Sequence, residues 1–229
     1  EKGRFIARPN RLIANLLGDE KIVKADVKNT GRCKELLVEG ATAYLQHHNN
    51  ENRKTEWTLI SVEKGDRLVN IDSMTPNRLM LEWIQTGNFL RNVEVIRPEF
   101  TFGNSRIDFF VKTASEKVLI EVKGVTLEEN NVAMFPDAPT ERGLKHIEEL
   151  CRSLYEGFKA YIIFIIQMQG VRCFTPNDRT HKAFADLLRL AGENGVEILA
   201  VDCDVGRDYI CIKDEVPVDL KGVGLTGTR

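Results

Sequence analysis

The sequence of 229 residues contains no hydrophobic run long enough to cross a membrane. A continuous apolar stretch, Tyr161–Ile166, is far shorter than the roughly 20 residues that a membrane-spanning helix needs. A short run of this kind is typical of a central strand that is buried on both faces of a sheet. No signal-peptide pattern follows the first residue, so we expect a cytoplasmic protein without a membrane partner.

The sequence also lacks paired cysteines. Its five cysteines are odd in number and widely spaced, and no C-x-x-C motif occurs. This pattern argues against a zinc ribbon, and scattered free thiols fit a reducing compartment. We therefore expect each cysteine to serve in packing.

An excess of positive charge is lacking as well. The net charge of −2 argues against a protein that is basic overall and binds nucleic acid with its whole surface. The charge is uneven, however, because Glu1–Glu35 carries nine Lys or Arg against five acids, a net charge of +4. A local basic face can bind phosphates while the rest of the protein stays acidic. For any single residue in this segment, an ordinary solvated surface remains the alternative.

What the sequence does contain indicates a globular protein in two parts. The hydrophobic content of 42% and the charged content of 29% are typical of a chain with a sizeable core. The first part has short strands separated by turns, which suit a small β-barrel of the kind that binds oligonucleotides. These expected strands are Arg4–Arg8, Arg11–Leu16, Lys21–Lys28, Thr42–Gln46 and Trp57–Val62.

The second part alternates between helix and strand patterns, which is typical of α/β architecture. Ser73-Met74-Thr75-Pro76 is a helix start signal, and no clear linker separates the two parts. The expected helices are Asn77–Gln85, Thr140–Phe158 and Thr180–Asn194, and the expected strands after the middle helix are Tyr161–Met168, Val196–Val201 and Tyr209–Lys213.

Two neighbouring strand patterns carry the residues with the clearest chemistry. Asp108 lies in Ser105–Phe109, and Glu121 and Lys123 lie in the next apolar strand, after a connection short enough for a hairpin. Side chains alternate along a strand, so Glu121 and Lys123 share a face, and Asp108 can approach them from the neighbouring strand. Two carboxylates can bind Mg²⁺ or Mn²⁺, and a lysine beside them can hold a water and offset developing negative charge. The alternative is an exposed salt bridge, although charges in an apolar strand are costly without a function.

The order Asp, then Glu-x-Lys, resembles the active site of the restriction-endonuclease-like (PD-(D/E)xK) nucleases. A longer set of segments resembles the sugar fermentation stimulation protein A family over nearly the whole chain. These segments are Arg4-Phe5, Asn29–Arg32, Arg53-Lys54, Val69-Asn70 through Pro76-Asn77-Arg78, Ser105–Phe109, Glu121–Leu127 and Phe135–His146. The resemblance implies an OB-like barrel, placed at residues 1–68, a restriction-endonuclease-like α/β domain at residues 69–229, and DNA binding.

The candidate site residues follow from the motif and from the resemblance. Asp108, Glu121 and Lys123 are the catalytic candidates, and Asp108 and Glu121 are metal ligands, helped by a backbone carbonyl near Val122. Glu82, on the preceding helix, is a third metal candidate because nucleases of this fold often carry an acid there; Glu99 competes with it. A plain surface acid is the alternative for both.

Positively charged and polar residues are expected to contact phosphate without reading bases. On the barrel and its neighbouring hairpin they are Arg4, Arg8, Arg32, Lys34, Arg53, Lys54 and Arg106. The start of the helix after Asp137 is a second phosphate-binding candidate, since backbone N–H groups face outward there. The resemblance implies a role near the carboxylates for Thr140, Arg142, Lys145 and His146, with helix capping, in which Asp137 is the expected cap, and surface charge as the alternative.

Three functions fit these observations. The first is a magnesium-dependent DNA nuclease. The second is a non-catalytic DNA-binding transcriptional regulator of sugar metabolism genes. The third is a protein that acts on RNA or another phosphorylated ligand. An intact Asp/Glu/Lys set favours the first over the second, because binding alone gains nothing from buried carboxylates that face a polyanion. The sequence does not predict the oligomeric state.

Overall fold

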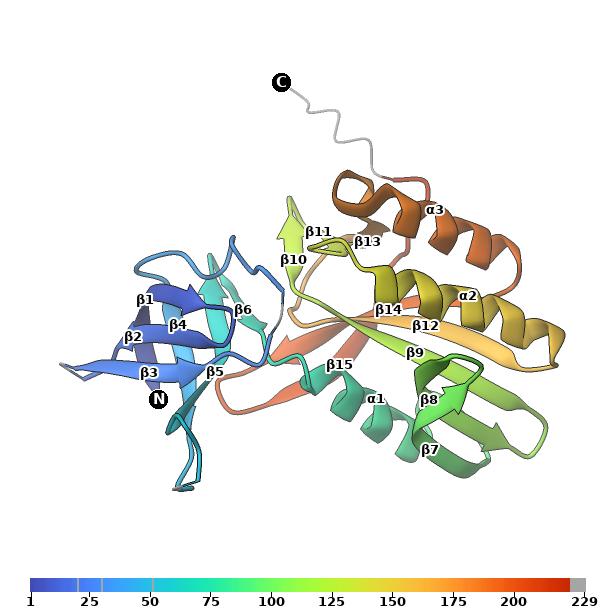
Figure 1. Ribbon diagram of the computed structural model, residues 1–229, viewed down its shortest axis with the longest axis horizontal. Coiled ribbons are helices and arrows are strands. Elements are labelled where there is room, and N and C mark those ends of the chain that lie inside the picture. Colours follow the sequence, from blue (N-terminus) through green and yellow to red (C-terminus); the bar gives the residue numbers. More distant parts are fainter. Residues whose placement is uncertain (20, 30, 51, 223–229) are drawn as a thin grey trace.

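The N-terminal part of the chain is a closed barrel of five strands (Figure 1). The computed structural model describes residues 1–222, with the exception of 20, 30 and 51. The barrel strands, in the order in which they pair, are β3 (Ile22–Asp26), β2 (Ile13–Leu17), β1 (Lys2–Asn10), β4 (Thr42–His47) and β5 (Trp57–Lys64). A short parallel pairing of Ala25 with Trp57 and Asp26 with Thr58 joins β3 to β5 and closes the barrel.

Alternation of apolar and polar residues along these strands forms the barrel core. Phe5, Leu16, Leu45 and Leu59 point inward and are buried, and the alternation is clearest on β1 and β2, where Arg4 and Leu17 beside them are exposed. The predicted OB-like barrel is confirmed. One further strand, β6 (Arg67–Asn70), pairs with β5 and was not predicted, because it contains only two apolar residues.

The C-terminal part is built on a mixed sheet of six strands. In spatial order they are β15 (Ile210–Glu215), β14 (Glu197–Val205), β12 (Lys159–Ile166), β9 (Lys117–Val125), β8 (Ser105–Thr113) and β7 (Val93–Phe102). The three central strands β9, β12 and β14 are parallel, and the outer strands pair antiparallel. The apolar segment Tyr161–Ile166 lies in the middle of this sheet and is buried throughout, as its composition predicts.

Helices cover both faces of this sheet (Figure 1). On one face, α1 (Thr75–Gln85) packs Leu79, Met80 and Ile84 against the sheet. On the other face, α2 (Glu141–Tyr155) and α3 (Asp178–Glu193) lie side by side. The α/β restriction-endonuclease-like architecture is therefore confirmed, and the central residues of the β8–β9 hairpin lie between α1 on one face and α2 on the other, whereas the turn that joins the two strands is exposed.

Three short strands make a small separate sheet that the sequence analysis did not predict. They are β10 (Leu127–Glu129), β11 (Val132–Phe135) and β13 (Cys173–Pro176). Each is too short to show a periodic pattern, and β11 and β13 pair across a separation of about forty residues. No helix within the described ranges is long and apolar enough to cross a membrane.

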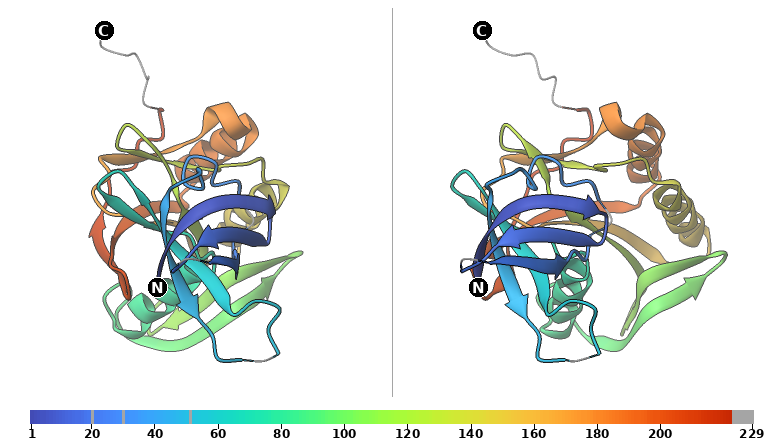
Figure 2. Two further views of the ribbon diagram at one scale, coloured as in Figure 1. Left: turned by 90° about the vertical axis from the view of Figure 1, so that its left-hand side faces the viewer. Right: turned by 60° about the vertical axis from the view of Figure 1, so that its left-hand side comes forward.

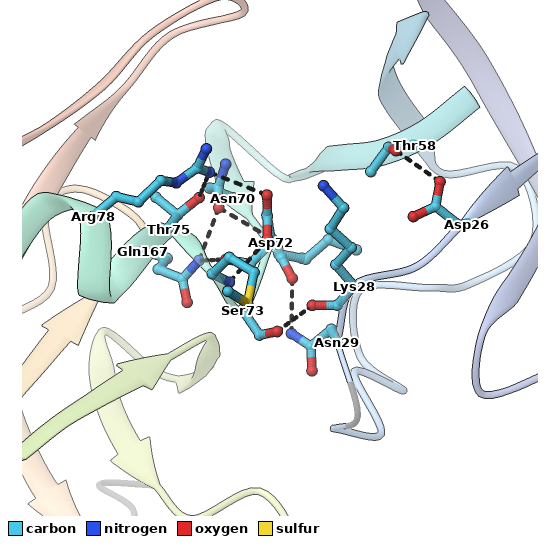
Figure 3. A network of polar contacts seen from close by, with 12 residues as sticks. Asp26, Lys28, Asn29, Thr58, Asn70, Asp72, Ser73, Thr75, Arg78 and Gln167 are labelled. Carbon is cyan, nitrogen blue, oxygen red and sulfur yellow. Dashed lines mark hydrogen bonds and ion pairs between the residues drawn. The ribbon is translucent and has the colours of Figure 1, made fainter. Parts of the chain in front are cut away.

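A network of buried polar groups joins the two parts (Figure 3). The Gln167 amide, which is 1% exposed, donates to Asn70 Oδ1 at 2.8 Å and to the Asp72 carbonyl at 3.1 Å. From the barrel side, Asn29 donates to the Ile71 carbonyl at 2.9 Å, and the Lys28 carbonyl accepts from the Ser73 N–H at 2.8 Å. When the barrel faces the viewer, the sheet and helices of the second part lie directly behind it (Figure 2). These bonds hold the barrel in one orientation against the second part.

Replacing Gln167 by leucine should destabilise the protein by about 1–3 kcal/mol, because buried acceptors lose their donor. Asn70 Oδ1 would keep only the Asp72 N–H. The free energy of unfolding in urea measures this change. Gln46→Leu, at an exposed position on β4, is the matched control and should change stability by less than about 0.5 kcal/mol. Equal stability of both variants would contradict the role given to the Gln167 network.

Candidate active site

Asp108 lies where β8 and β9 part. The pairing of the two strands runs from Lys112 and Lys117 to Phe109 and Ile120 and ends one residue before Asp108. At this point Asp108 Oδ2 accepts a hydrogen bond from the Val122 backbone N–H at 2.8 Å. The carboxylate thus replaces a backbone acceptor at the end of the ladder, which fixes it beside Glu121 on the neighbouring strand.

The Glu121 carboxylate is the most deeply buried charge of this cluster. The residue is 1% exposed, and its Oε1 accepts from Lys123 Nζ at 2.6 Å and contacts His146 Nδ1. Burial works to raise the pKa of Glu121, but the Lys123 ammonium and the His146 ring outweigh it and hold the pKa below its ordinary value. The second oxygen, Oε2, is buried and has no hydrogen-bond partner within the described residues. A buried carboxylate oxygen without a partner is costly, so it indicates a site for a positive ligand.

Asp108 has the opposite electrostatic character. Burial, followed by the negative charge of Glu121, raises the pKa of Asp108 to about 6. The Val122 N–H and the Asn77 side chain, whose Nδ2 donates to Asp108 Oδ1 at 2.9 Å, oppose this shift only in part. The fold therefore holds the Asp108 and Glu121 carboxylates close together although they repel each other. A divalent cation bound between them would relieve this repulsion.

Asn77 is the residue of α1 that reaches this cluster, whereas Glu82 was the residue predicted at that place. The two positions lie five residues apart, or about 140° around the helix, so they face different directions. Glu82 lines a separate cavity beside Tyr44 and Arg207. Within the described ranges there is no group of three or more His, Cys, Asp and Glu that could hold a metal. A signal for Asn77 was present, because Pro76-Asn77-Arg78 belongs to the segments that carry the family resemblance.

The polar junction between the two parts also sets the direction of Asn77. At the start of α1, Asp72 accepts hydrogen bonds from the Met74 N–H at 2.9 Å and from Arg78 at 3.2 Å, and Arg78 also donates to Thr75 (Figure 3). These bonds fix the first turn of α1 on the segment Asp72–Thr75, and the bond from the Ser73 N–H to the Lys28 carbonyl ties this segment to the barrel. The barrel therefore contacts the segment from which α1, and with it Asn77, begins.

The start of α2 differs from the prediction in two respects. Thr140 is the N-cap, since its Oγ1 accepts from the Gly143 N–H at 3.0 Å, whereas Asp137 was the expected cap. Asp137 instead accepts from the Arg32 backbone N–H at 3.0 Å and thereby links the two parts. Of the side chains expected to contact phosphate here, Lys145 is exposed, but His146 is 4% exposed and faces Glu121.

Several of the predicted phosphate contacts are used inside the protein. Arg8 donates to four backbone carbonyls of its own loops, at 2.7–3.2 Å, and Arg53 pairs with Asp26 at 2.7 Å. Arg106 forms an ion pair with Glu99 at 3.0 Å on the surface, where both side chains are exposed, and neither Arg106 nor Glu99 contacts Asp108 or Glu121. The remaining predicted contacts on the barrel are exposed: Arg4, Arg32, Lys34 and Lys54.

A cavity of about 390 Å³ lies between the barrel and the second part, and none of Asp108, Glu121 and Lys123 lines it. Gly124, which follows Lys123 directly, and Thr140, which starts α2, belong to its lining. The other polar lining residues include Arg11, Asn29, Ser73, Asp137 and Gln167. The cavity thus connects loops of the barrel with the end of β9 that carries Lys123.

The fold and the site define a class of protein, an OB barrel followed by a restriction-endonuclease-like domain. Comparison with known sequences identifies the family. Residues 74–209 match the sugar fermentation stimulation protein RE domain, and residues 6–71 match the SfsA N-terminal OB domain. The chain therefore belongs to the sugar fermentation stimulation protein family.

Individual relatives cover nearly the whole chain. A sugar fermentation stimulation protein homolog from Ruminiclostridium cellulolyticum is 53% identical over 220 residues, which cover 96% of this chain and 97% of the relative. A homolog from Clostridium beijerinckii is 54% identical over 219 residues, with the same two coverages. The solved structure of SfsA from Pyrococcus furiosus, in complex with Ca²⁺, is 29% identical, covers 95% of each chain and superposes with a TM-score of 0.88.

Proposed function

We propose that the protein is a metal-dependent nuclease that hydrolyses phosphodiester bonds of DNA. The observation that carries the proposal is the buried Glu121 carboxylate, whose Oε2 has no partner within the described residues and which lies beside Asp108 and Lys123. The unpartnered oxygen and the raised pKa of Asp108 lie in one cluster with Lys123, and it is this combination that supports a functional site.

The donor set fits a hard divalent cation. Mg²⁺ binds through one or two carboxylates and keeps several waters, and the cluster offers two carboxylates and no sulfur or imidazole ligand in a free position. Asp108 and Glu121 would hold Mg²⁺ or Mn²⁺, together with a backbone carbonyl near Val122 and waters. The bound cation would polarise the phosphate and lower the barrier to attack by water. The complex of the Pyrococcus furiosus protein with Ca²⁺ supports a divalent cation in this family.

The surrounding residues supply position and charge. Lys123 is placed to orient the attacking water and to offset the negative charge that grows on the phosphate. The Val122 N–H and Asn77 hold Asp108 in one orientation. Asn77 donates to Asp108 through its amide nitrogen, so it orients the carboxylate without adding charge to the site.

We infer that DNA approaches through the cavity between the barrel and the second part. Exposed Arg32, Lys34 and Lys54 lie on the barrel, and small barrels of this type hold single strands along a basic groove. The cavity, of about 390 Å³, is lined by barrel residues such as Arg11 and Asn29 and by residues of the second part such as Gly124 and Thr140. A strand held by the barrel would then pass Ser73 and Gly124 on its way to Lys123.

The direct test is incubation of the purified protein with single-stranded and double-stranded DNA in Mg²⁺, Mn²⁺ or EDTA. We expect cleavage in Mg²⁺ or Mn²⁺, no cleavage in EDTA, and faster cleavage of the single strand. Binding without cleavage in every metal would favour the non-catalytic regulator. If RNA, added as a further substrate, is cleaved and DNA is not, the substrate is RNA and not DNA.

The exposed cations of the barrel should control the salt dependence of binding. Changing Arg32, Lys34 and Lys54 together to glutamine should weaken DNA binding for all sequences and flatten the slope of log K against log salt, by about 0.7 for each lost contact to a single strand. Fluorescence anisotropy over a salt series measures this slope. The control is the double variant Lys112→Gln and Lys182→Gln, which should leave the slope unchanged. Both lysines lie on the surface of the second part, and each forms an ion pair with a neighbouring acid. An unchanged slope in the triple variant would leave these residues as solvated surface.

A further inference from the structure

His146 is buried and contacts Glu121, the proposed metal ligand, from within the protein. The side chain is 4% exposed and lies on the buried face of α2, where its neighbour Ile147 packs into the core. Its Nδ1 contacts Glu121 Oε1, the same oxygen that Lys123 binds. A residue held in this way cannot turn outward to contact DNA, which was the role that the sequence analysis gave it.

We propose that His146 is a positioning residue that holds Glu121 Oε1 and thereby leaves Oε2 available for the cation. The proposal rests on the proposed function, since it concerns the same metal site. A carboxylate on a flexible side chain can offer either oxygen to a ligand, so a donor that fixes one oxygen also selects the other. In this cluster the fixed oxygen has two donors, and the selected oxygen has none within the described residues.

Arg142 determines which nitrogen of the ring carries the hydrogen. Its Nε approaches His146 Nε2 at 3.3 Å, one turn earlier on α2. A guanidinium has only donors, so Nε2 must be the unprotonated, accepting nitrogen. In the neutral ring, Nδ1 then carries the hydrogen and donates it to Glu121 Oε1. The chain of contacts from Arg142 through His146 to Glu121 has the form of an outer-shell contact that orients a metal ligand.

Lys123 alone cannot hold Glu121 Oε1 in place during the reaction. In the proposed function its ammonium must face the water and the phosphate, whereas in this structure it binds Glu121 at 2.6 Å. The Lys123 side chain is 14% exposed and lies nearer to solvent than His146. If Lys123 turns toward a substrate, His146 keeps its hold on Oε1, and Glu121 stays in the orientation that binds the cation.

The position of the donor atom provides the test. An asparagine amide at position 146 places its N–H groups near the position of Nδ1, whereas a glutamine amide reaches the position of Nε2 and faces Arg142. His146→Asn should therefore bind Mn²⁺ about as tightly as the wild type. His146→Gln and His146→Leu should bind it about 10–100-fold more weakly, as is usual when an outer-shell contact to a ligand is lost.

Isothermal titration with Mn²⁺ on the full-length protein, at one pH and without DNA, measures the dissociation constants. The comparison of His146→Asn with His146→Gln needs no apolar variant, so it holds even if His146→Leu fails to fold. Wild-type affinity in His146→Gln, or equal losses in the asparagine and glutamine variants, would overturn the role of Nδ1. If the wild type itself binds no Mn²⁺, the proposed metal site falls together with this inference; if it binds and every variant binds equally, only this inference falls.

Discussion

Replacing Asp108 by asparagine should stabilise the metal-free protein at pH 8 and abolish its stabilisation by Mn²⁺. The two expected changes have opposite signs and one cause. The fold holds the ionised Asp108 beside Glu121 although the pKa of Asp108 is raised to about 6. Above pH 6 the folded protein therefore carries a charge that it would be more stable without, and asparagine removes this charge while its amide oxygen still accepts from the Val122 N–H.

The sign of the pH dependence follows from the two pKa values. The ordinary pKa of the carboxyl is 3.8 and the folded value is about 6, so between these values the folded state holds the proton more tightly than the unfolded chain. The free energy of unfolding that this group contributes therefore falls as the pH rises from about 4 to about 6. The penalty is fully present above that window and absent below it. We expect Asp108→Asn to gain on the order of 1–2 kcal/mol at pH 8 and almost nothing at pH 4.

Thermal unfolding at both pH values, with Mn²⁺ or EDTA, checks this result. Excess Mn²⁺ should raise the melting temperature of the wild type by mass action and leave that of Asp108→Asn unchanged. Asp66→Asn, in the exposed turn before β6, is the matched control and should behave as the wild type. Glu82→Gln should also keep the response to Mn²⁺, because α1 turns Glu82 away from the cluster. An equal response to Mn²⁺ in Asp108→Asn would place the metal site elsewhere.

The β8–β9 hairpin was predictable because its determinants are local. Asp108, Glu121 and Lys123 lie within sixteen consecutive residues, and alternation in an apolar strand fixes which of them share a face. Strand patterns also indicated a small barrel and helix–strand alternation indicated an α/β second part, and the family resemblance implied the architecture of both domains; the pairing of β3 with β5 and the placement of helices on both faces of the sheet were not predicted.

The partners of these residues were not predictable, because they depend on contacts between distant segments. Asn77 reaches Asp108 across 31 positions, and His146 reaches Glu121 across 25. A count of charges cannot tell an outward arginine from one that binds backbone carbonyls, as Arg8 does, or an acid, as Arg53 does. Sequence patterns therefore predicted that Asp108, Glu121 and Lys123 lie together, whereas the structure was needed for the residues that contact them.

Replacing Lys123 by alanine should lower the rate of DNA cleavage by about 10²–10³-fold, which is typical for loss of one preorganised charge in an active site. DNA affinity should change little, because a single cation is a small part of the total contact with a polyanion. The fold should survive, since the apolar cores on both faces of the sheet are unaffected and His146 still contacts Glu121.

Single-turnover cleavage at saturating DNA separates the rate from binding, and a gel-shift assay on the same preparations gives the affinity. Lys182→Ala, which removes an exposed lysine of α3 that pairs with Asp186, is the matched control and should cleave as the wild type. Equal cleavage by wild type and Lys123→Ala would mean that the activity comes from a contaminant or from another site. If neither protein cleaves in any metal while both bind DNA, the nuclease proposal fails, and Asp108, Glu121 and Lys123 form a structural ion network. DNA binding is then the remaining activity, and the protein acts as a DNA-binding regulator.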